Sequence, residues 1–443
     1  VQLGGQTPLK LTRGLEAAGV TILGTSPDSI DAAEDRRRFE QIAREIGLTQ
    51  PPSGTATRLE DALAAAERIG YPVLVRPSYV LGGRAMQICY DAPSLEGFFA
   101  TAALASEERP VLIDRFLEDA FEVDVDAISD GENVVIGGIM QHIEDAGIHS
   151  GDSACVLPPY MIEERAMQTM REQTIAMAKA FKVVGLINVQ FAIRDGVVYV
   201  LEVNPRASRT IPFVSKAIGA PLASYAARVM CGETLEQIGF TEEVMPPFVS
   251  VKEAVFPFSK FSNTDPVLGP EMKSTGEVMG ISESFGAAFA KAQLAASNGL
   301  PLEGSILITV NDSDKKTVTP VARFFQEMGF KLFATRGTAN YLRTRGIPVS
   351  SVFKVHEGRP NCLDMIVNGD VDLLINTPLG KHAQWDDYTL RQAAIRQRIA
   401  YTTTMSAARA AADAILSLKS RRPAVRSLQE WQQDILDAAA VEV

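Results

Sequence analysis

The chain has 443 residues, 46% of them hydrophobic and 22% charged, a composition typical of a globular protein with two or three domains. Its formal net charge of −11, without a long Lys/Arg run, argues against a surface for duplex DNA or anionic membranes. Four widely spaced cysteines and no apolar run of membrane-spanning length argue against a disulfide framework, a zinc site or a membrane span, so we expect a cytoplasmic protein.

Residues 1–25 predict one βαβ unit. A short strand leads through Gly4-Gly5 into a helix over Thr7–Ala18, and VTILG at 20–24 predicts a second strand. Because the first strand begins at Val1 without a methionine, we expect that strand to be truncated and the chain to be a fragment of a longer protein.

The next segment predicts an α+β region. Ser26-Pro27 is a helix start, followed by a charged amphipathic helix over 33–47, a helix over 61–70 and a strand over 72–77. SYVLGGRAMQICY predicts a glycine turn between two strands, and a helix is expected near 95–104. From 110 to 140, apolar and acidic residues alternate as in half-exposed antiparallel strands.

A helix within 160–183 leads into a predicted hairpin, INVQFAIRDGVVYVLEVN. A two-residue Asp-Gly turn in a regular ladder would put Gln190 and Glu202 on opposite faces. We therefore predict a three-residue loop over 194–196, which pairs Asn188 with Glu202 and sets Gln190 diagonally on the same face.

Residues 215–230 predict helix, and the proline-rich stretch 244–261 predicts irregular structure. From 301 onward, SILITV, FKLFAT and VDLLINT alternate with helical segments. That rhythm predicts a parallel sheet with helices on both faces, with a domain boundary near 297–304.

Three oxygen-bearing side chains in the hairpin, Gln190, Glu202 and Asn204, carry a single formal charge. Magnesium prefers oxygen ligands and typically takes one or two carboxylates together with phosphates, so this set suits Mg-nucleotide. The alternative is that these residues merely face solvent. Arg206 follows at once and could stabilise charge on a transferring phosphoryl group.

Other candidates are weaker. Gly82 and Gly83, beside Arg76 and Arg84, could cover phosphates or simply form a hairpin turn. Arg38 is one of three successive arginines and is expected on a solvated helix face. His149 could be a general base, although a loop histidine is more often structural.

A strand-to-helix turn at Thr335, Gly337 and Thr338 could receive phosphate, with Lys315 and Lys354 adding charge, or be an ordinary N-cap.

Taken together, the motifs GGQTPLKL, GTSPDSIDAAEDR, VRPSYVLGGRAM, GIHSGDSAC, NVQFA, LEVNPRASRT, GPEMKSTGEVMG and KVHEGRP resemble the C-terminal half of the large subunit of carbamoyl phosphate synthetase, over essentially the whole chain. The resemblance implies an α+β ATP-grasp domain followed by an α/β doubly wound parallel-sheet regulatory domain. Its parts would be a remnant of a pre-ATP-grasp unit (1–25), the ATP-grasp synthetic domain (26–232), a helical or irregular extension (233–299) and a methylglyoxal-synthase-like allosteric domain (300–443).

The resemblance also implies roles for individual residues. ATP would contact Arg38, Arg76, Arg115, Leu117, Glu122, Gly147, Ile148, His149, Ser150, Gln190 and Glu202, with Glu122 holding the ribose hydroxyls. Gln190, Glu202 and Asn204 would bind Mg²⁺ or Mn²⁺, with K⁺ as a further cofactor, and Arg206, Arg76 and Asn204 would be catalytic. Position 115 is histidine in some members of the family.

The implied reaction is the phosphorylation of carbamate by MgATP, the second phosphorylation in carbamoyl phosphate synthesis for arginine and pyrimidines. Carbamate is already an anion, so this step needs no general base. Implied partners are the N-terminal half of the large subunit and a glutaminase small subunit.

Implied effectors are UMP or IMP, at Lys315, Thr335, Thr338, Lys354 and Asn376, and ornithine, at Glu144, Asp152, Glu253 and Thr403. Pro378 and Thr402 replace a threonine and an aspartate of the enterobacterial pattern, which weakens the expectation of phosphate and ornithine contacts there.

Two other readings stay open. The chain could be another ATP-grasp carboxylate-amine ligase or a biotin carboxylase relative, which would share Glu202 and Asn204 but would not be expected to carry the C-terminal module. It could also be a non-catalytic regulatory and assembly fragment.

Overall fold

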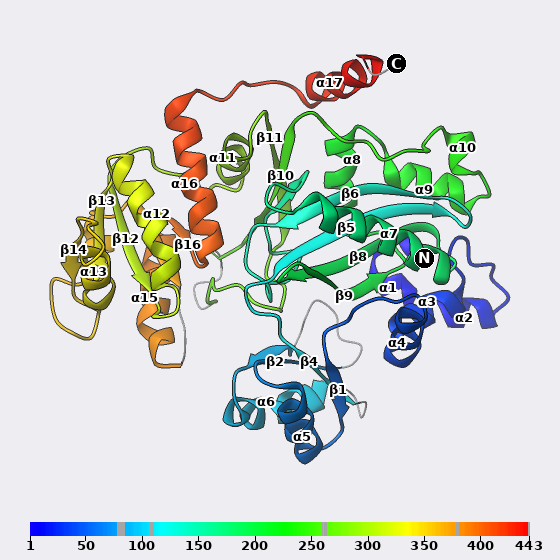
Figure 1. Cartoon of the computed structure of the whole chain (residues 1–443), viewed down its shortest axis with the longest axis horizontal. Coiled ribbons are helices and arrows are strands. Elements are labelled where there is room, and N and C mark those ends of the chain that lie inside the picture. Colours follow the sequence, from blue (N-terminus) through cyan, green and yellow to red (C-terminus); the bar gives the residue numbers. More distant parts are fainter. Residues whose placement is uncertain (78–84, 106–109, 259, 261–263, 378–380, 442–443) are drawn as a thin grey trace.

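A computed structural model describes the chain except for residues 78–84, 106–109, 259, 261–263, 378–380 and 442–443. Three sheets organise the described residues: a small four-stranded lobe, a central seven-stranded sheet and a five-stranded parallel sheet. Figure 1 shows the small lobe below the central sheet and the parallel-sheet domain to one side.

The small lobe is an antiparallel sheet in the order β1-β4-β2-β3. Its strands are β1 (Ser53–Ala56), β2 (Val73–Arg76), β3 (Gln87–Cys89) and β4 (Val111–Arg115), and its helices are α5 (Leu59–Ile69) and α6 (Ala92–Ala105). Alternate residues of a strand share a face, so Val73 and Val75 are both fully buried, in one core with Ala62 and Ala66 of α5. The predicted helices over 61–70 and 95–104 and the strand over 72–77 are confirmed.

The central sheet is antiparallel throughout, in the order β11-β10-β7-β6-β5-β8-β9. Its strands are β5 (Phe121–Asp130), β6 (Val134–His142), β7 (Cys155–Leu157), β8 (Val184–Arg194), β9 (Val197–Asn204), β10 (Val249–Val255) and β11 (Gly276–Ser282). The prediction of irregular structure over 244–261 was wrong for β10, which pairs with two strands. Buried Ser250 and Lys252 interrupt the apolar signal that a buried strand normally gives.

Helices cover the two faces of this sheet unequally. Against one face, α7 (Glu164–Ala180), α3 (Pro27–Glu34) and α4 (Arg36–Glu45) bury a core that includes Val125, Val189 and Val200. On the other face, α8 (Ile211–Ile218) and α9 (Leu222–Met230) share a core with Ile128 and Leu186, followed by the short α10 (Leu235–Ile238). The rest of that second face carries polar side chains.

The N-terminal prediction was largely wrong. The segment forms a 3₁₀ turn (Gln2–Gly4), α1 (Gln6–Leu9) and α2 (Thr12–Ala17), and residues 20–24 form no strand. Among the described residues no strand pairs with 20–24, so the backbone hydrogen bonds of a strand there would have no partner. The charged helix over 33–47 is divided at Asp35, whose carboxylate caps α4 by accepting from Arg37 N and Arg38 N, while the helix start at Ser26-Pro27 is confirmed.

The C-terminal domain is a parallel sheet in the order β14-β13-β12-β15-β16, as predicted. Its strands are β12 (Ser305–Val310), β13 (Lys331–Thr335), β14 (Ser350–Val352), β15 (Leu373–Thr377) and β16 (Ala400–Thr402). On one face lie α12 (Lys315–Glu327), α13 (Arg336–Arg343) and α16 (Met405–Ser420), and on the other α14 (Cys362–Asn368) and α15 (Lys381–Gln397).

Among the described residues, two of the contacts that join this domain to the central domain involve apolar helix packing. Helix α11 (Phe285–Ala295), packed on β10 and β11, meets α16 so closely that a Cβ added at Gly286 would lie 2.5 Å from the Asp413 carbonyl oxygen. The chain then runs back over the central domain to α17 (Leu428–Val441) (Figure 1), where Trp431 is 3% exposed and its ring lies 5.3 Å from Phe248. At these two places the packing between the domains is largely apolar.

Candidate functional site

A β-bulge in the hairpin of β8 and β9 brings the proposed metal ligands together. The turn has two residues, Asp195 and Gly196, both with positive φ (52° and 75°), so the predicted three-residue loop was wrong. The register shifts between Gln190 and Phe191, where Leu201 is the extra residue, and Gln190 therefore lies directly opposite Glu202. The predicted common face is correct, but the bulge and not the turn creates it.

The same face continues across β5. Asp124 pairs with Gln190, and Asp126 pairs with Asn188, which in turn pairs with Asn204. Three adjacent strands thus present carboxylates and amides side by side. Asp126 is fully buried and accepts hydrogen bonds from Asn188 Nδ2 (2.9 Å) and Ser208 Oγ (2.8 Å), so it anchors the segment that follows Arg206.

Glu202, Asn204 and Arg206 form a chain of hydrogen bonds at the end of β9. Asn204 Nδ2 donates to Glu202 Oε1 at 2.8 Å, and an Arg206 guanidinium N–H donates to Asn204 Oδ1 at 2.9 Å. Burial lowers the pKa of Arg206, and the charges of Glu202 and Glu34 oppose that shift. Gln190 Nε2 donates to Ser150 Oγ at 3.3 Å, which ties the metal-site candidate to the 147–153 segment.

The donor set fits a hard cation such as Mg²⁺, which takes oxygen ligands and tolerates few carboxylates. Within the described part of the chain, no group of three or more His, Cys, Asp or Glu side chains is arranged to hold a metal. A site built from Glu202 and two amides, completed by ligand oxygens, is consistent with that finding.

Arg76 approaches from the small lobe. Its Nε donates to Asp114 Oδ2 at 2.8 Å, and Asp114 also pairs with Arg36 at 3.1 Å. Burial acts to lower the pKa of Arg76, but the charges of Asp114 and Glu202 outweigh it and raise that pKa. Arg76 therefore lies within the electrostatic reach of Glu202.

Arg38 does not join this group: its guanidinium pairs with Asp28 (2.9 Å) and Asp31 (3.1 Å) on α3. Arg36, which the sequence reasoning missed, is the member of the arginine run that reaches Asp114. Arg115 donates to the Tyr71 carbonyl within the small lobe, and Gly82, Gly83 and Arg84 lie outside the described residues.

Two of the proposed nucleotide residues, Glu122 on β5 and Gly147, are joined by a hydrogen bond. Glu122 Oε1 accepts from Gly147 N at 3.0 Å, while Leu117 and Ile148 are buried apolar neighbours of this region. Gly147 has φ +95°, and a Cβ there would lie 2.8 Å from the Phe116 ring, so only glycine fits.

His149 has a structural role in this arrangement. Its Nδ1 accepts from Gly151 N at 3.0 Å, and burial lowers the pKa of its imidazole. The Asp152 carboxylate accepts from Lys273 N (2.8 Å) and Ser274 N (2.9 Å), and Lys252 Nζ donates to Ser150 O (3.2 Å). The segment is held by the protein rather than left free for proton transfer.

Sequence reasoning missed His142, which lies 3.4 Å from both Glu122 Oε2 and Asp124 Oδ2. Burial disfavours its charged form, but Cys155 and Asp124 raise its pKa well above the ordinary value. Neither ring nitrogen, nor Asp124 Oδ1, has a hydrogen-bond partner among the described residues. No local signal marks His142, because it follows Gln141 at the end of an otherwise apolar buried strand.

The proposed effector residues are partly brought together. Lys315 at the start of α12 pairs with Asp312 (2.6 Å), and its Nζ lies 3.5 Å from where a Cβ on Gly337 would stand. Thr335 is the N-cap residue of α13, and Thr338 Oγ1 is 3.5 Å from the Val310 carbonyl. The hydrogen bond from Lys315, together with the charge of Lys354, lowers the pKa of Asp312.

Asn376 is buried and hydrogen-bonded to Thr309, Asp387 and Arg391. Thr402 Oγ1 is buried at β16 without a partner among the described residues, and Pro378 lies outside them.

Two of the proposed ornithine residues act on each other. Burial, and then the charge of Glu144, raises the pKa of Glu253 well above its usual range. Glu253 accepts a hydrogen bond from Gln293 Nε2 at 2.8 Å, and Glu144 accepts one from Ala154 N at 2.6 Å. Thr403 is the residue that follows β16.

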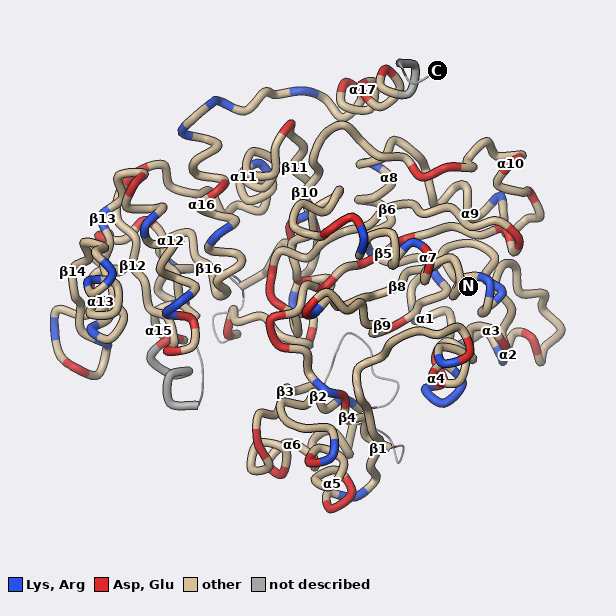
Figure 2. Tube along the Cα trace, viewed as in Figure 1, with Lys and Arg blue, Asp and Glu red and all other residues tan. Residues whose placement is uncertain are grey.

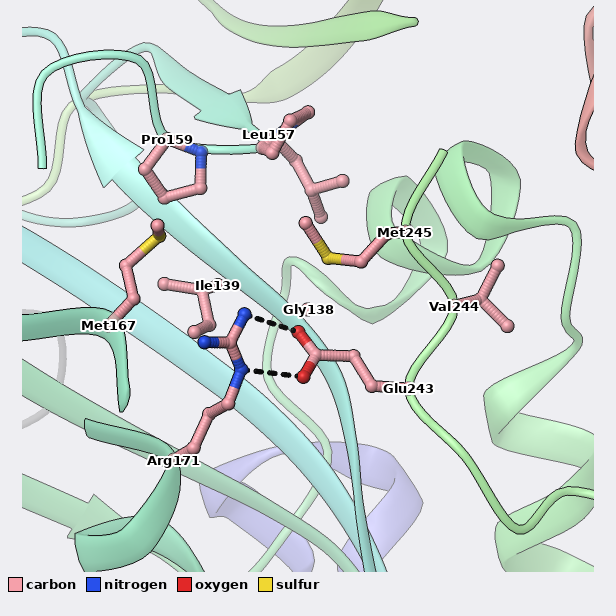
Figure 3. A pocket seen from close by; sticks show the side chains of 10 residues that line it. Gly138, Ile139, Leu157, Pro159, Met167, Arg171, Glu243, Val244 and Met245 are labelled. Atoms are coloured by element: carbon pink, nitrogen blue, oxygen red, sulfur yellow. Dashed lines mark hydrogen bonds and ion pairs between the residues drawn. The ribbon is translucent and has the colours of Figure 1, made fainter. Parts of the chain in front are cut away.

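A hollow near α7 is a poor candidate (Figure 3). Its lining includes Arg171 and Glu243, whose double hydrogen bond (2.7 and 3.3 Å) neutralises both charges, with Met167, Met245 and prolines around them. Figure 2 shows acidic and basic residues interspersed along the trace of the described residues.

Comparison with known proteins identifies two families within the chain. Residues 35–238 match the family described as the ATP binding domain of the carbamoyl-phosphate synthase L chain, and residues 317–403 match the MGS-like domain family. None of the described helices is both long and apolar enough to span a bilayer.

Curated relatives match over nearly the whole chain. The carbamoyl phosphate synthase large chain of Gemmatimonas aurantiaca is 66% identical over 442 residues, and that of Archaeoglobus fulgidus is 55% identical over 435. These alignments cover 100% and 98% of this chain but only 40% of each relative, so the chain spans about 40% of their length.

Solved structures share the fold of about two thirds of the chain. The biotin carboxylase domain of the Hydrogenobacter thermophilus 2-oxoglutarate carboxylase aligns with TM-score 0.55 and 18% identity, over 65% of this chain and 70% of that one. Biotin carboxylase from Campylobacter jejuni aligns with TM-score 0.54 and 16% identity, over 65% and 71%. At these identities the likeness concerns the fold alone.

Proposed function

The chain belongs to the family of carbamoyl phosphate synthase large chains, and from that premise we propose that it transfers the γ-phosphoryl group of MgATP to carbamate, giving carbamoyl phosphate and ADP. In the proposed step a carbamate oxygen forms a bond to the γ-phosphorus as the bond to the ADP oxygen breaks. No proton moves, and the total charge is conserved between carbamate plus ATP and carbamoyl phosphate plus ADP.

The observation that carries the proposal is the position of Gln190 opposite Glu202, with Asn204 at the end of β9 and Arg206, just beyond it, donating to Asn204. Glu202 and the two amide oxygens would hold Mg²⁺. The ion, when bound, supplies positive charge that offsets the phosphate oxygens. Mn²⁺ and K⁺ as alternative or additional cations stay predictions.

In this proposal two arginines stabilise the negative charge on the transferred phosphoryl group. Arg206 is fixed by its bond to Asn204 and Arg76 by its bond to Asp114, so neither guanidinium needs to reorganise when charge develops. His149 Nδ1 already accepts a hydrogen bond from Gly151 N, which agrees with a reaction that needs no general base.

The nucleotide would lie between β5 and the 147–153 segment. Glu122 would accept from the ribose hydroxyls, and buried Leu117 and Ile148 would flank the base. Arg38, on α4, would contribute only if the lobes rearrange, because its present partners are Asp28 and Asp31 of α3.

The second family match supports a regulatory proposal for the C-terminal domain. Nucleotide effectors such as UMP or IMP would bind near Lys315, Thr335 and Thr338, with Lys354 and Asn376. Ornithine would bind near Glu144, Asp152, Glu253 and Thr403. The same proposal includes a role in arginine and pyrimidine synthesis and a cytoplasmic location. It also includes two partners, the N-terminal half of the large subunit and a glutaminase small subunit.

A biotin carboxylase relative is the nearest alternative, since the fold is shared. The MGS-like domain and the 66% identity to a carbamoyl phosphate synthase large chain favour the function proposed here.

The test runs the reaction backwards. The full chain is incubated with ADP, Mg²⁺ and carbamoyl phosphate, and ATP is measured, with and without added biotin. ATP formation independent of biotin supports the proposal. ATP formation only with biotin supports the alternative, and no ATP from a chain that binds MgADP supports a non-catalytic fragment.

A further inference from the structure

The 264–275 segment connects the parallel-sheet domain with the proposed nucleotide site. It follows β10 and contains the sequence GPEMKST (269–275), which no proposed ligand contact uses. On one side it meets α15, and on the other it meets the 147–153 segment. It therefore lies between the two domains and makes polar contacts with both.

Arg391 of α15 holds the first end of this segment. Its side chain is fully buried, and its guanidinium donates to both Asp265 oxygens, at 3.0 and 2.8 Å. The third nitrogen donates to Asn376 Oδ1 at 2.7 Å, and the neighbouring Gln392 donates to the Thr264 carbonyl at 2.8 Å. A bidentate guanidinium–carboxylate pair fixes direction as well as distance.

Lys273 links the two ends of the segment through hydrogen bonds. Its Nζ donates to the carbonyls of Asp265 (2.9 Å) and Val267 (2.7 Å), which closes the segment on itself. Its own backbone N–H donates to Asp152 Oδ2 at 2.8 Å. The end held by Arg391 and the end that meets the site are thus parts of one hydrogen-bonded unit.

The other end of the segment holds the proposed nucleotide loop. In addition to the Lys273 contact, Ser274 N donates to Asp152 Oδ1 (2.9 Å) and Ser274 Oγ donates to the Gly151 carbonyl (3.0 Å). His149 N donates to the Gly269 carbonyl (2.8 Å). From this loop Ser150 Oγ reaches Gln190. A shift of 264–275 would therefore displace His149, Ser150 and the amide of Gln190 together.

We propose that Arg391 is a positioning residue of the nucleotide and metal site, which it serves from the other domain by fixing the 264–275 segment against residues 147–153. The proposal rests on the function proposed above, because it concerns the same site. Arg391 itself touches no substrate. It holds the loop in the geometry that in-line transfer requires, where a misplacement of about 1 Å is costly.

The test compares Arg391→Gln, Asp265→Asn and the double variant with Arg396→Gln, an exposed arginine on the same helix. We expect each of the first three to raise KM for MgADP in the reverse assay at least about tenfold with a smaller change in kcat. The KM of the double variant should be no higher than that of the single variant with the larger effect, because both substitutions break the same Arg391–Asp265 pair. Arg396→Gln should behave as wild type.

Amide hydrogen exchange over residues 147–153, without nucleotide, is the second readout and does not depend on activity. Faster exchange there in Arg391→Gln and Asp265→Asn supports the proposal. Unchanged KM and unchanged exchange in both variants, or additive effects in the double variant, overturn it. Should Arg391→Gln not fold, Asp265→Asn, whose side chain is 35% exposed, decides alone.

A wild-type chain that makes no ATP would refute the proposed function, and the exchange measurement would still decide the role of Arg391.

Discussion

Gln190 and Glu202 lie directly opposite each other on β8 and β9, because Leu201 is an extra residue in β9. A regular ladder from the Asp195-Gly196 turn would pair Gln190 with Leu201 and turn Glu202 to the far face. One bulged residue therefore decides whether the amide and the carboxylate can share a cation.

The charge of Glu202 is predicted to be essential. Glu202→Gln keeps the size and the strand but removes the carboxylate, so ATP formation should fall by more than about 100-fold, beyond the 10- to 100-fold typical of losing an outer-shell partner. Glu132→Gln, at the exposed turn between β5 and β6, is the control. Turnover within a few-fold of wild type, with the same melting temperature, would refute the metal assignment.

The hairpin turn should be sensitive to backbone conformation. Asp195 has φ +52°, a region that β-branched residues avoid, so Asp195→Val should destabilise the protein by about 1–2 kcal/mol. Asp195→Asn should be neutral, because asparagine suits the same turn. Urea denaturation of both variants measures the difference, and equal midpoints would contradict the turn geometry.

Asp126 should make stability depend on pH. Burial raises its pKa to about 6, against the hydrogen bonds from Thr210 and Asn188 that lower it. The folded state then binds a proton more tightly than the unfolded state, so this group's contribution falls as pH rises from about 4 to about 6, by roughly 3 kcal/mol in total.

Asp126→Asn does not titrate, which isolates that contribution. The unfolding free energy of this variant minus that of wild type should rise between about pH 4 and pH 6 and level off above. Any constant loss of hydrogen bonding shifts the whole curve without changing its slope. Parallel curves for the two proteins would contradict the raised pKa.

Lys315 is predicted to contribute to anion binding by the parallel-sheet domain. Its ammonium lies beside Gly337 at the start of α13, so Lys315→Ala should weaken UMP binding about tenfold, or roughly 1.4 kcal/mol. Lys331→Ala, at the opposite end of β13, is the matched control. Calorimetric titration with UMP and with inorganic phosphate measures both, and equal affinities would place the effector elsewhere.

Local patterns in the sequence were enough for much of the architecture. Alternation over 188–204 predicted the hairpin, Ser26-Pro27 predicted a helix start, and the rhythm after residue 301 predicted the parallel sheet. Such signals work because strand and helix periods, caps and turns depend on residues only a few positions apart.

Tertiary structure alone decided the rest. The bulge at Leu201 depends on how two strands fit, and β10 exists because β7 and β11 pair with it despite its buried Ser250 and Lys252. Only the fold selects Arg36 over Arg38 as a partner of Asp114, and only the fold brings Arg391 to Asp265, 126 residues away. These contacts join distant segments, so their energy depends on packing that no short window of sequence contains.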